Sequence, residues 1–509
     1  MHLFDFVLLG LAAWLVSRIF AKRPAGPLPP GPKGYPIIGS LLEMPLKYSW
    51  LTFAQWSERW GDLTTFTLLG QRFLLVNNAD DALELLEKKS AIYSSRSSIP
   101  VGGDMIGWSQ TMIMQNEPAR MREYRKLVGT VMASHTRVQR FGDLIEADTK
   151  QFLTALPQRT DTLFHELQKL AGSIVVTITY GYKAKSDHDE IITAVDKAMA
   201  DFALVTQPGA FVADVFPILT SIPSWFPGTA WMQKAAQSKK LLEDMVQLPY
   251  VWVKKQMAAG THKSSFVTAL LDEPHDDARE ELIKLVAASM YAGGADTTVS
   301  SSMTFFLAMT LYPEVQKKAQ AELDSVIGHG QLPTLADRER LPYLNAILLE
   351  VLRWIPVAPM GFPHLSTEDD FHKDYFIPKG TMVMVNSWNL LHDPVRYTDP
   401  NTFNPDRFLD TPSHPAERDP RDFAFGYGRR KCPGIFFAEA SIFTAVALTL
   451  AVYDIAKAVD ARGKTIEPAV EPSGTLISHP APFPLRVSVR SPKAQALLDS
   501  WEHAGEVAF

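Results

Sequence analysis

Cysteine is almost absent from this chain, because Cys432 is the only one in 509 residues. A single cysteine excludes an intramolecular disulfide. An excess of positive charge is absent as well: the formal net charge is -6, which gives no indication of nucleic-acid binding. With 46% hydrophobic residues, the chain can bury a large core.

Internal boundaries are also lacking. After the proline-rich stretch that ends near Pro36, no Gly/Ser tract, charge block or internal repeat divides the chain, which favours one large domain over residues 37–509. No G-x-G-x-x-G run follows an expected strand, so no flavin or nicotinamide site is evident.

Residues 1–21 are predicted to form a membrane anchor. Residues 3–20 are almost wholly apolar, and eighteen helical residues span about 27 Å, close to the roughly 30 Å of a hydrocarbon core. Lys22 and Arg23 follow the apolar run, whereas a cleaved signal peptide carries its basic residues before it. The alternative is a buried N-terminal helix.

The next segment, residues 22–36, is first basic and then rich in proline. Its prolines permit neither helix nor central strand, so it should act as a stiff hinge. By the positive-inside rule Lys22 and Arg23 stay in the cytosol, which predicts a single-pass protein whose domain, residues 37–509, is cytosolic.

The hydrophobic pattern predicts a mainly helical protein with a small β portion. Alternating residues at 63–69 and 72–76 predict a hairpin that turns at Gly70-Gln71. Apolar residues that recur every three or four positions predict helices at 80–89, 119–132, 163–180, 189–204, 235–259, 313–327 and 343–354.

The longest expected helix begins at Asp277, which has capping-box character with Glu280, and ends near Tyr312. From Glu280 to Leu311 it would extend about 48 Å, the diameter of a sizeable domain. Its centre holds Gly293 and Gly294, each of which costs roughly 1 kcal/mol relative to Ala in a helix interior. We therefore expect a site there that gains from local weakness of the helix.

The one cysteine lies in a distinctive run, residues 425–434, which read FGYGRRKCPG. A thiolate that ligates iron must be held in a tight loop whose backbone amides point at the sulfur. Gly428 and Gly434 permit such a close backbone approach. The apolar stretch 435–451 reads as a helix, whose N-terminus should lower the pKa of Cys432. The alternative, a buried structural cysteine, does not account for the flanking glycines and arginines.

Residues 425–434 resemble the haem-binding signature of the cytochrome P-450 monooxygenases, and the resemblance extends from the N-terminal anchor to about Pro484. It implies the cytochrome P-450 fold, a haem b cofactor, and Cys432 as the axial ligand of the haem iron. As members of the same signature, Phe425 and Gly434 would also contact the haem.

The centre of the long helix, residues 292–299, resembles the oxygen-binding groove of the same family. Gly293 and Gly294 would then make room for dioxygen, Thr297 would donate a hydrogen bond to it, and Asp296 would help to deliver protons. The alternative for Thr297 is a hydroxyl that bonds back to the preceding turn beside a helix kink.

Two haem propionates need cationic or hydrogen-bonding partners when they are buried. By resemblance, Arg430 and His364 would bind them, and one helix would supply Arg125 as its better candidate and Arg120 as its weaker one. The family commonly has Trp where this chain has Met121, so an indole donor is missing. Either arginine of that helix would alternatively be solvated.

Glu350, Arg353 and Arg407 resemble the Glu-Arg-Arg lock that fixes the loop around the cysteine in this family. Glu350 and Arg353 are three residues apart and share a helical face. Alone, such a pair indicates little, because surface ion pairs of this kind are common and weak. We assign these three residues a structural role.

The regions that line the substrate pocket by resemblance are mostly apolar, chiefly residues 97–115, 202–212 and 357–362. Such a lining suits a hydrophobic small molecule. The patterns at 214–228 and 476–480 look most like fungal microsomal members of secondary metabolism, so a terpenoid or polyketide is the expected kind of substrate.

The resemblance also implies that electrons come from a partner, an NADPH-dependent cytochrome P-450 reductase, with cytochrome b5 as a second candidate donor. NADPH would then act only through that partner. Arg429 and Lys431 are the expected exposed charges for docking, and the attraction should weaken with salt. The predicted location is the endoplasmic reticulum membrane.

Three hypotheses therefore remain open. The first is a monooxygenase that hydroxylates or epoxidises its substrate with one atom of dioxygen. The second is a haem-thiolate isomerase or dehydratase that needs no reductase, and the third is a membrane haem protein without catalysis. Asp296 and Thr297 favour the first, since proton-delivery groups would be superfluous in the third.

Overall fold

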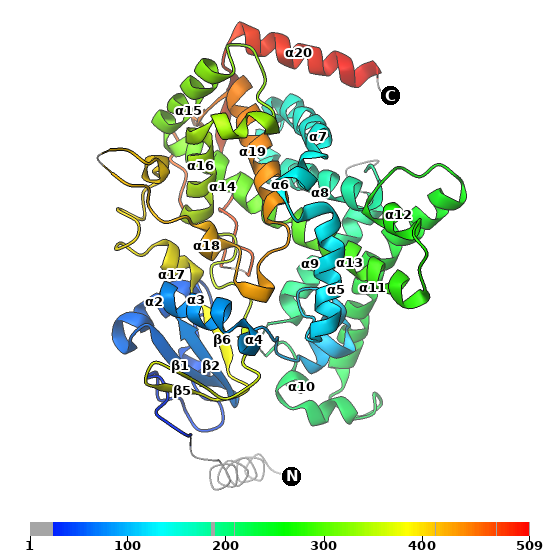
Figure 1. Cartoon of the computed structure of the whole chain (residues 1–509), viewed down its shortest axis with the longest axis vertical. Coiled ribbons are helices and arrows are strands. Elements are labelled where there is room, and N and C mark those ends of the chain that lie inside the picture. The colour runs from blue at the N-terminus through cyan, green and yellow to red at the C-terminus, as the bar shows by residue number, and fades with distance from the viewer. Residues whose placement is uncertain (1–23, 185–188, 208, 413, 475, 508–509) are drawn as a thin grey trace. The chain divides into compact units, whose positions relative to one another are not determined.

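The computed structural model describes residues 24–184, 189–207, 209–412, 414–474 and 476–507 (Figure 1). The predicted anchor, residues 1–21, lies outside these residues, and the division into anchor, hinge and domain stays a prediction. The described chain forms two compact units. The sheet unit comprises residues up to Ser97, Ala358–Leu390 and Gly426–Lys431, and the helical unit comprises Ser98–Val357, Leu391–Phe425 and the residues from Cys432 onward.

The sheet unit is built on four strands in the order β1-β2-β6-β3. Strands β1 (Leu63–Leu68) and β2 (Gln71–Val76) are antiparallel, β2 is parallel to β6 (Met382–Val385), and β3 (His364–Leu365) is antiparallel to β6. The predicted hairpin is confirmed. Its turn is Leu69-Gly70, one residue earlier than predicted, and both residues have positive φ, as the tight turn of a twisted hairpin requires.

Short elements complete this unit. They are α2 (Ser49–Trp60), α3 (Ala79–Leu83), α4 (Ser90–Tyr93), most of α17 (Ser387–Leu391) and the hairpin of β4 (Asp370–His372) and β5 (Tyr375–Ile377). Asn78 caps α3 by accepting from the N–H groups of Asp80 and Asp81. The helix predicted at 80–89 is confirmed in extent, although its second half, Glu84–Lys88, is a wider π-type turn.

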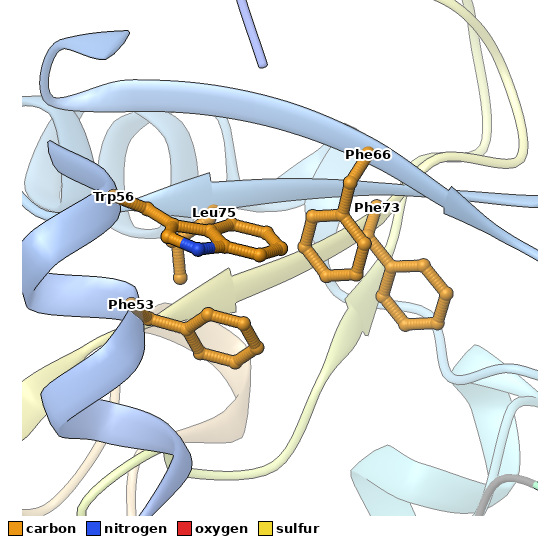
Figure 2. Close-up of a cluster of buried hydrophobic side chains, with 5 residues drawn as sticks. All are labelled: Phe53, Trp56, Phe66, Phe73 and Leu75. Atoms are coloured by element: carbon orange, nitrogen blue, oxygen red, sulfur yellow. The ribbon is translucent and has the colours of Figure 1, made fainter. Parts of the chain in front are cut away.

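An aromatic cluster fills the space between α2 and the sheet (Figure 2). Phe53 and Trp56 come from α2, and Phe66, Phe73 and Leu75 come from β1 and β2. Phe66 and Phe73 face each other across the hairpin, and their rings stack with centroids 5.0 Å apart. Such cross-strand aromatic pairs add to the apolar area that the cluster buries.

The helical unit contains most of the helices, as the sequence pattern predicts. Their bounds are α5 (Pro118–Met132), α6 (His135–Gln139), α7 (Gly142–Ala155), α8 (Leu163–Tyr180), α9 (Glu190–Val205), α10 (Val212–Val215), α11 (Ala230–Ala258), α12 (Phe266–Leu271), α13 (Asp277–Ala295), α14 (Thr297–Leu311), α15 (Pro313–Val326), α16 (Pro342–Trp354), α18 (Arg421–Ala424), α19 (Ile435–Val452) and α20 (Pro492–Val507). Strands β7 (Tyr453–Lys457) and β8 (Leu485–Val489) pair antiparallel.

Two helices form the centre of this unit. Every residue of α14 from Val299 to Thr310 is buried, and α14 packs against α8, α16 and α19. Among the described residues, α19 is the one helix long and apolar enough to cross a membrane, but 78% of it is buried in the unit. Its apolar length is therefore explained by its place in the core.

The long central helix differs from the prediction in two ways. It is interrupted at Asp296, which divides it into α13 and α14. It begins at Asp277 as predicted, but its N-cap is Asp276, whose carboxylate accepts from the N–H of Arg279, so only the capping role expected of Asp277 is wrong, by one residue. Two consecutive aspartates left this choice open to sequence reasoning, because either can cap a helix.

We predict that Phe66→Ala lowers the free energy of unfolding by about 3–5 kcal/mol, because it removes the ring at the centre of the aromatic cluster. Leu46→Ala is the control, since this side chain is fully exposed, and should change stability by less than about 0.5 kcal/mol. Guanidinium denaturation measures both. Equal effects for the two variants would contradict the prediction.

Candidate active site

The loop that carries Cys432 is closed by its own backbone. The N–H of Cys432 donates to the carbonyl of Phe425 at 2.8 Å, which makes a tight bend of the segment between them. Helix α19 begins three residues after the cysteine, at Ile435, with Gly434 as its N-cap residue. The predicted loop followed by a helix is therefore present.

Cys432 is an exposed residue, although many protein atoms surround its thiol. The side chain has solvent-accessible surface, yet surrounding protein atoms raise the pKa of the thiol. The N–H of Gly434 and the charge of Arg125 oppose this shift without cancelling it. Our expectation of a lowered pKa is thus wrong for the protein alone, because burial outweighs the helix N-terminus.

Gly428 and Gly434 differ in what they require of the backbone. In the sheet unit, Gly428 has φ of +50°, and a Cβ there would lie 2.4 Å from the carbonyl oxygen of Leu86. Only glycine fits that position. Gly434 has ordinary φ, and a Cβ would meet Cys432 Sγ at 3.9 Å, so the contribution of Gly434 is its N–H.

The centre of the long helix is accessible, although the turns on both sides are buried. Gly293 is exposed and residues 294–298 are half-buried, whereas 290–292 and 299–310 are buried. A Cβ on Gly293 would meet no atom within 4 Å, so this glycine faces open space. A Cβ on Gly294 would lie 2.7 Å from Cγ2 of Val175 in α8. Close packing of α13 on α8 therefore explains why residue 294 is a glycine. Gly293 is left as the candidate that makes room for dioxygen.

The hydroxyl of Thr297 donates to the carbonyl of Gly293 at 2.7 Å, beside the helix break. This is the back-bonded arrangement that the sequence left open as an alternative. The hydroxyl hydrogen is engaged, so Thr297 must give up this bond before it donates to another molecule. Its oxygen can still accept a hydrogen bond.

Asp296 is held by a residue that sequence reasoning missed. Nε2 of His479 lies 3.0 Å from Oδ1 of Asp296, although 183 positions separate the two residues in the chain. A weak signal was present, since His479 is part of the Ser-His-Pro run at 478–480 that we used only for its resemblance.

Helix α5 presents its two candidate arginines differently. Arg125 is close enough to Cys432 for their charges to interact, and burial lowers the pKa of Arg125. Nε of Arg120 donates to the hydroxyl of Tyr124 at 3.1 Å, and its guanidinium lies over the same ring. Arg125 is therefore placed near Cys432, and the propionate role of either arginine stays a prediction.

In the sheet unit, Arg430 and His364 lie near a third residue, the cation Arg96, which sequence reasoning missed. Arg96 donates to the carbonyls of Phe362 and Pro363 at 2.8 and 2.6 Å. Burial and the charge of Arg430 lower the pKa of Arg96 to about 9. Burial, followed by the charge of Arg96, lowers the pKa of His364 to about 3. An anion in this cluster would relieve the repulsion among its positive charges.

Glu350, Arg353 and Arg407 form a buried ion cluster. Two nitrogens of Arg353 donate to Glu350 at 2.6 and 2.8 Å, and Nε of Arg407 donates to Glu350 at 3.2 Å. Glu417 is a fourth member that we did not predict, and it accepts from Arg407 at 2.8 Å. Two acids and two arginines leave no net charge. The recorded bonds of Arg353 and Arg407 to backbone run to carbonyls of residues 391–402, so the cluster fastens that segment to α16.

A cavity of about 160 Å³ lies beside Phe425 in the helical unit. Its walls come from α16, α18 and α19, and they include Leu349, Leu352 and Ile442. Most ligand sites are at least twice as large, roughly 300–1,000 Å³. We therefore do not assign the substrate to this cavity.

These residues fit a haem. Cys432 is exposed and could ligate iron, and the N–H of Gly434 would moderate the charge of its sulfur. The accessible part of α13 and α14 belongs to the same unit, where Thr298 and Ser302 line a narrow apolar cavity together with Phe437 of α19. The cations Arg96 and Arg430 suit propionate carboxylates.

Comparison with known proteins settles the family. The family model described as cytochrome P-450 matches residues 29–485. The chain belongs to the cytochrome P-450 family.

Curated fungal relatives agree over nearly the whole length. Cytochrome P-450 monooxygenase 208 of Postia placenta is 44% identical, over 98% of this chain and 98% of its own. Cytochrome P-450 monooxygenase claR of Ampulloclitocybe clavipes is 42% identical, over 96% of this chain and 91% of its own. A zebra fish cytochrome P-450 solved with abiraterone has a TM-score of 0.70 at 21% identity, covering 87% of this chain and 100% of its own. That structure supports the cytochrome P-450 fold.

The predicted family, fold and enzyme class are thus confirmed: this cytochrome P-450 is a monooxygenase whose cofactor is haem. The roles of individual residues in haem binding, oxygen binding and proton delivery stay predictions.

We predict opposite effects for the two glycines of the accessible helix centre. Gly293→Ala should raise the free energy of unfolding by up to about 1 kcal/mol, because Ala favours helix and no atom obstructs its Cβ. Gly294→Ala should lower it by about 1–3 kcal/mol, because its Cβ overlaps Val175. Val175→Ala should rescue the second variant. Thermal unfolding measures all three, and a similar effect of both glycine substitutions would contradict the assignment.

Glu350→Gln should lower the free energy of unfolding by about 3–5 kcal/mol, since it leaves two buried guanidinium groups with one carboxylate fewer. Lys240→Ala removes an exposed ion pair with Asp244 and serves as the control, with an expected change below about 0.5 kcal/mol. Circular dichroism during denaturation follows both variants. A loss under about 1 kcal/mol for Glu350→Gln would show that the cluster is not needed for stability.

Proposed function

We propose that this enzyme hydroxylates or epoxidises a hydrophobic small molecule, with electrons that an NADPH-dependent cytochrome P-450 reductase delivers. For hydroxylation the balance is substrate, dioxygen, NADPH and one proton to hydroxylated product, water and NADP⁺. The observation that carries the proposal is the exposed Cys432, whose sulfur has the N–H of Gly434 and the charge of Arg125 beside it.

In this proposal Cys432 ligates the haem iron, with Phe425 and Gly434 beside it, and Arg430, His364 and Arg125 supply propionate partners. We add Arg96 to that group because it is near enough to Arg430 and His364 for its charge to act on both. When bound, a thiolate-ligated haem supplies the activation of dioxygen. The protein provides space at Gly293. The hydroxyl of Thr297 and the carboxylate of Asp296 hold and move protons at the accessible helix centre.

The apolar segments 97–115 and 202–212 support a hydrophobic substrate. We propose that it is a terpenoid or polyketide of fungal secondary metabolism. Trp108 and Phe202 are buried, and their ring centroids lie 4.5 Å apart. Gly102 allows its segment to approach the carbonyl of Val205 in α9, because a Cβ there would lie 2.4 Å from that oxygen. The loop 97–115 and α9 thus share a closely packed apolar surface.

We further propose that residues 1–21 anchor the enzyme in the endoplasmic reticulum membrane and that residues 22–36 are its hinge. Arg429 is exposed and Lys431 half-buried in the sheet unit, so Arg429 is the stronger candidate for contact with the reductase. Cytochrome b5 would approach through the same kind of attraction between opposite charges.

The reaction is tested with ¹⁸O-labelled dioxygen, a panel of hydrophobic terpenoids and polyketides, and membranes that contain the enzyme with or without the reductase. We expect product that carries one ¹⁸O atom only when NADPH and reductase are both present, and none from Cys432→Ser. Product that forms without NADPH would favour the isomerase or dehydratase instead. Haem-replete enzyme that transforms no compound under either condition would favour the non-catalytic alternative.

A further inference from the structure

Asp296 stands where the long helix is broken, and its side chain is not left to solvent. The residue has φ of -109° and ψ of -36°, and it ends α13. Its Oδ1 lies 3.0 Å from Nε2 of His479, with 32% of the Asp296 side chain and 15% of the His479 side chain exposed. A carboxylate oxygen accepts, so Nε2 of His479 carries the hydrogen.

The imidazole of His479 is held in place by its own segment. The N–H of His479 donates to Oγ of Ser473 at 3.0 Å, and its carbonyl accepts from the N–H of Ser473 at 2.7 Å. The ring meets Phe164 of α8 edge to face, with centroids 5.3 Å apart. These contacts hold the imidazole ring of His479 in place independently of Asp296, so His479 differs from a mobile surface histidine.

The same segment is fastened to the helix that follows the break. The hydroxyl of Ser300 in α14 donates to the carbonyl of Ser478, and the N–H of Ser478 donates to the carbonyl of Val357 at 2.8 Å. His479 therefore keeps its position relative to α14, and through its ring it sets the position of Asp296.

The charges around this pair explain why Asp296 needs a donor. Burial, followed by repulsion from the carboxylate of Asp296, raises the pKa of Asp196 in α9. His165 of α8 opposes that effect on Asp196. A carboxylate with an acidic neighbour gains from a fixed N–H group on its other side.

We propose that His479 is a positioning residue for Asp296: its Nε2–H holds Oδ1, so that Oδ2 is the oxygen that takes up a proton from solvent and releases it at the accessible helix centre. His479 keeps its own Nε2 proton and transfers none. This inference rests on the proposed function, in which Asp296 delivers protons.

A positioning role of His479 predicts different effects for two substitutions of this residue. The side-chain amide of Gln donates a hydrogen bond but carries no titratable proton, so His479→Gln should behave like the wild type. His479→Leu removes the donor and should release Asp296. His165→Leu is the matched control, because His165 is exposed and the structure records no bond from it to Asp296 among the described residues.

The first readout is the infrared stretch of carbon monoxide bound to the reduced full-length holoenzyme, which senses polar groups near the ligand. We expect His479→Leu and Asp296→Asn to shift or broaden the band, and His479→Gln and His165→Leu to leave it unchanged. An unchanged band in His479→Leu, or a shifted band in His479→Gln, would overturn the proposal.

The second readout needs no known substrate. With reductase and NADPH alone, reduction of one dioxygen to hydrogen peroxide consumes one NADPH and one proton, whereas reduction to two waters consumes two NADPH and two protons. We expect His479→Leu to reduce the ratio of water formation to peroxide formation roughly tenfold, part of the 10²–10⁴ that a positioned proton donor contributes. His479→Gln should stay within about twofold of the wild type.

A double substitution guards against a general loss of structure. In the Asp296→Asn background, His479→Leu should change the ratio no further, because the two residues act as one unit. Independent, multiplying effects would overturn the proposal. If instead the wild type shows no haem-thiolate spectrum and no NADPH-dependent reduction of dioxygen, the proposed function itself fails. If the wild type is active and His479→Leu has the same ratio of water to peroxide, only the role of His479 fails.

Discussion

The constraint on which the proposed site depends is that Cys432 must carry a negative charge in a crowded environment when it ligates iron. Burial raises the pKa of Cys432, and the two protein groups that oppose it, the N–H of Gly434 and the charge of Arg125, do not cancel the effect. A coordinating metal ion removes the thiol proton outright. The surroundings of the sulfur therefore suit a thiolate that is bound to iron better than a free thiolate.

The backbone near the sulfur follows from this constraint. The Cys432 N–H is engaged by the carbonyl of Phe425, which shapes the loop, while the Gly434 N–H is directed to the sulfur. In the sheet unit, Gly428 fits against the carbonyl of Leu86 only because it lacks a Cβ. One glycine thus permits packing of the loop, and the other supplies a donor at the start of α19.

The helix centre shows how local weakness is confined. Gly294 is needed for close packing of α13 on α8, whereas Gly293 opens space, and the break falls at Asp296. The buried run from Val299 to Thr310 then restores a rigid helix directly after the break. Weak secondary structure at the site is compensated by tertiary packing on either side.

Much of this could be read from the sequence, because helices and the hairpin are local patterns and the cysteine run is distinctive. Leu163–Tyr180 was predicted to the residue, and Glu350, Arg353 and Arg407 do form a buried cluster. The partners Arg96, Glu417 and His479 were missed because only the tertiary fold brings them to their sites. The predicted direction of the pKa shift of Cys432 was wrong for the same reason, since burial depends on the tertiary fold and not on the local sequence.

The most direct test of the account is the carbon monoxide difference spectrum of the reduced full-length protein. Ligation of ferrous haem by the Cys432 thiolate predicts the strongly red-shifted Soret band of a haem-thiolate complex, and Cys432→Ser should lose it. A well-folded wild-type protein that binds haem but lacks the red-shifted band, or a Cys432→Ser variant that keeps it, would contradict the assignment of Cys432 as the iron ligand.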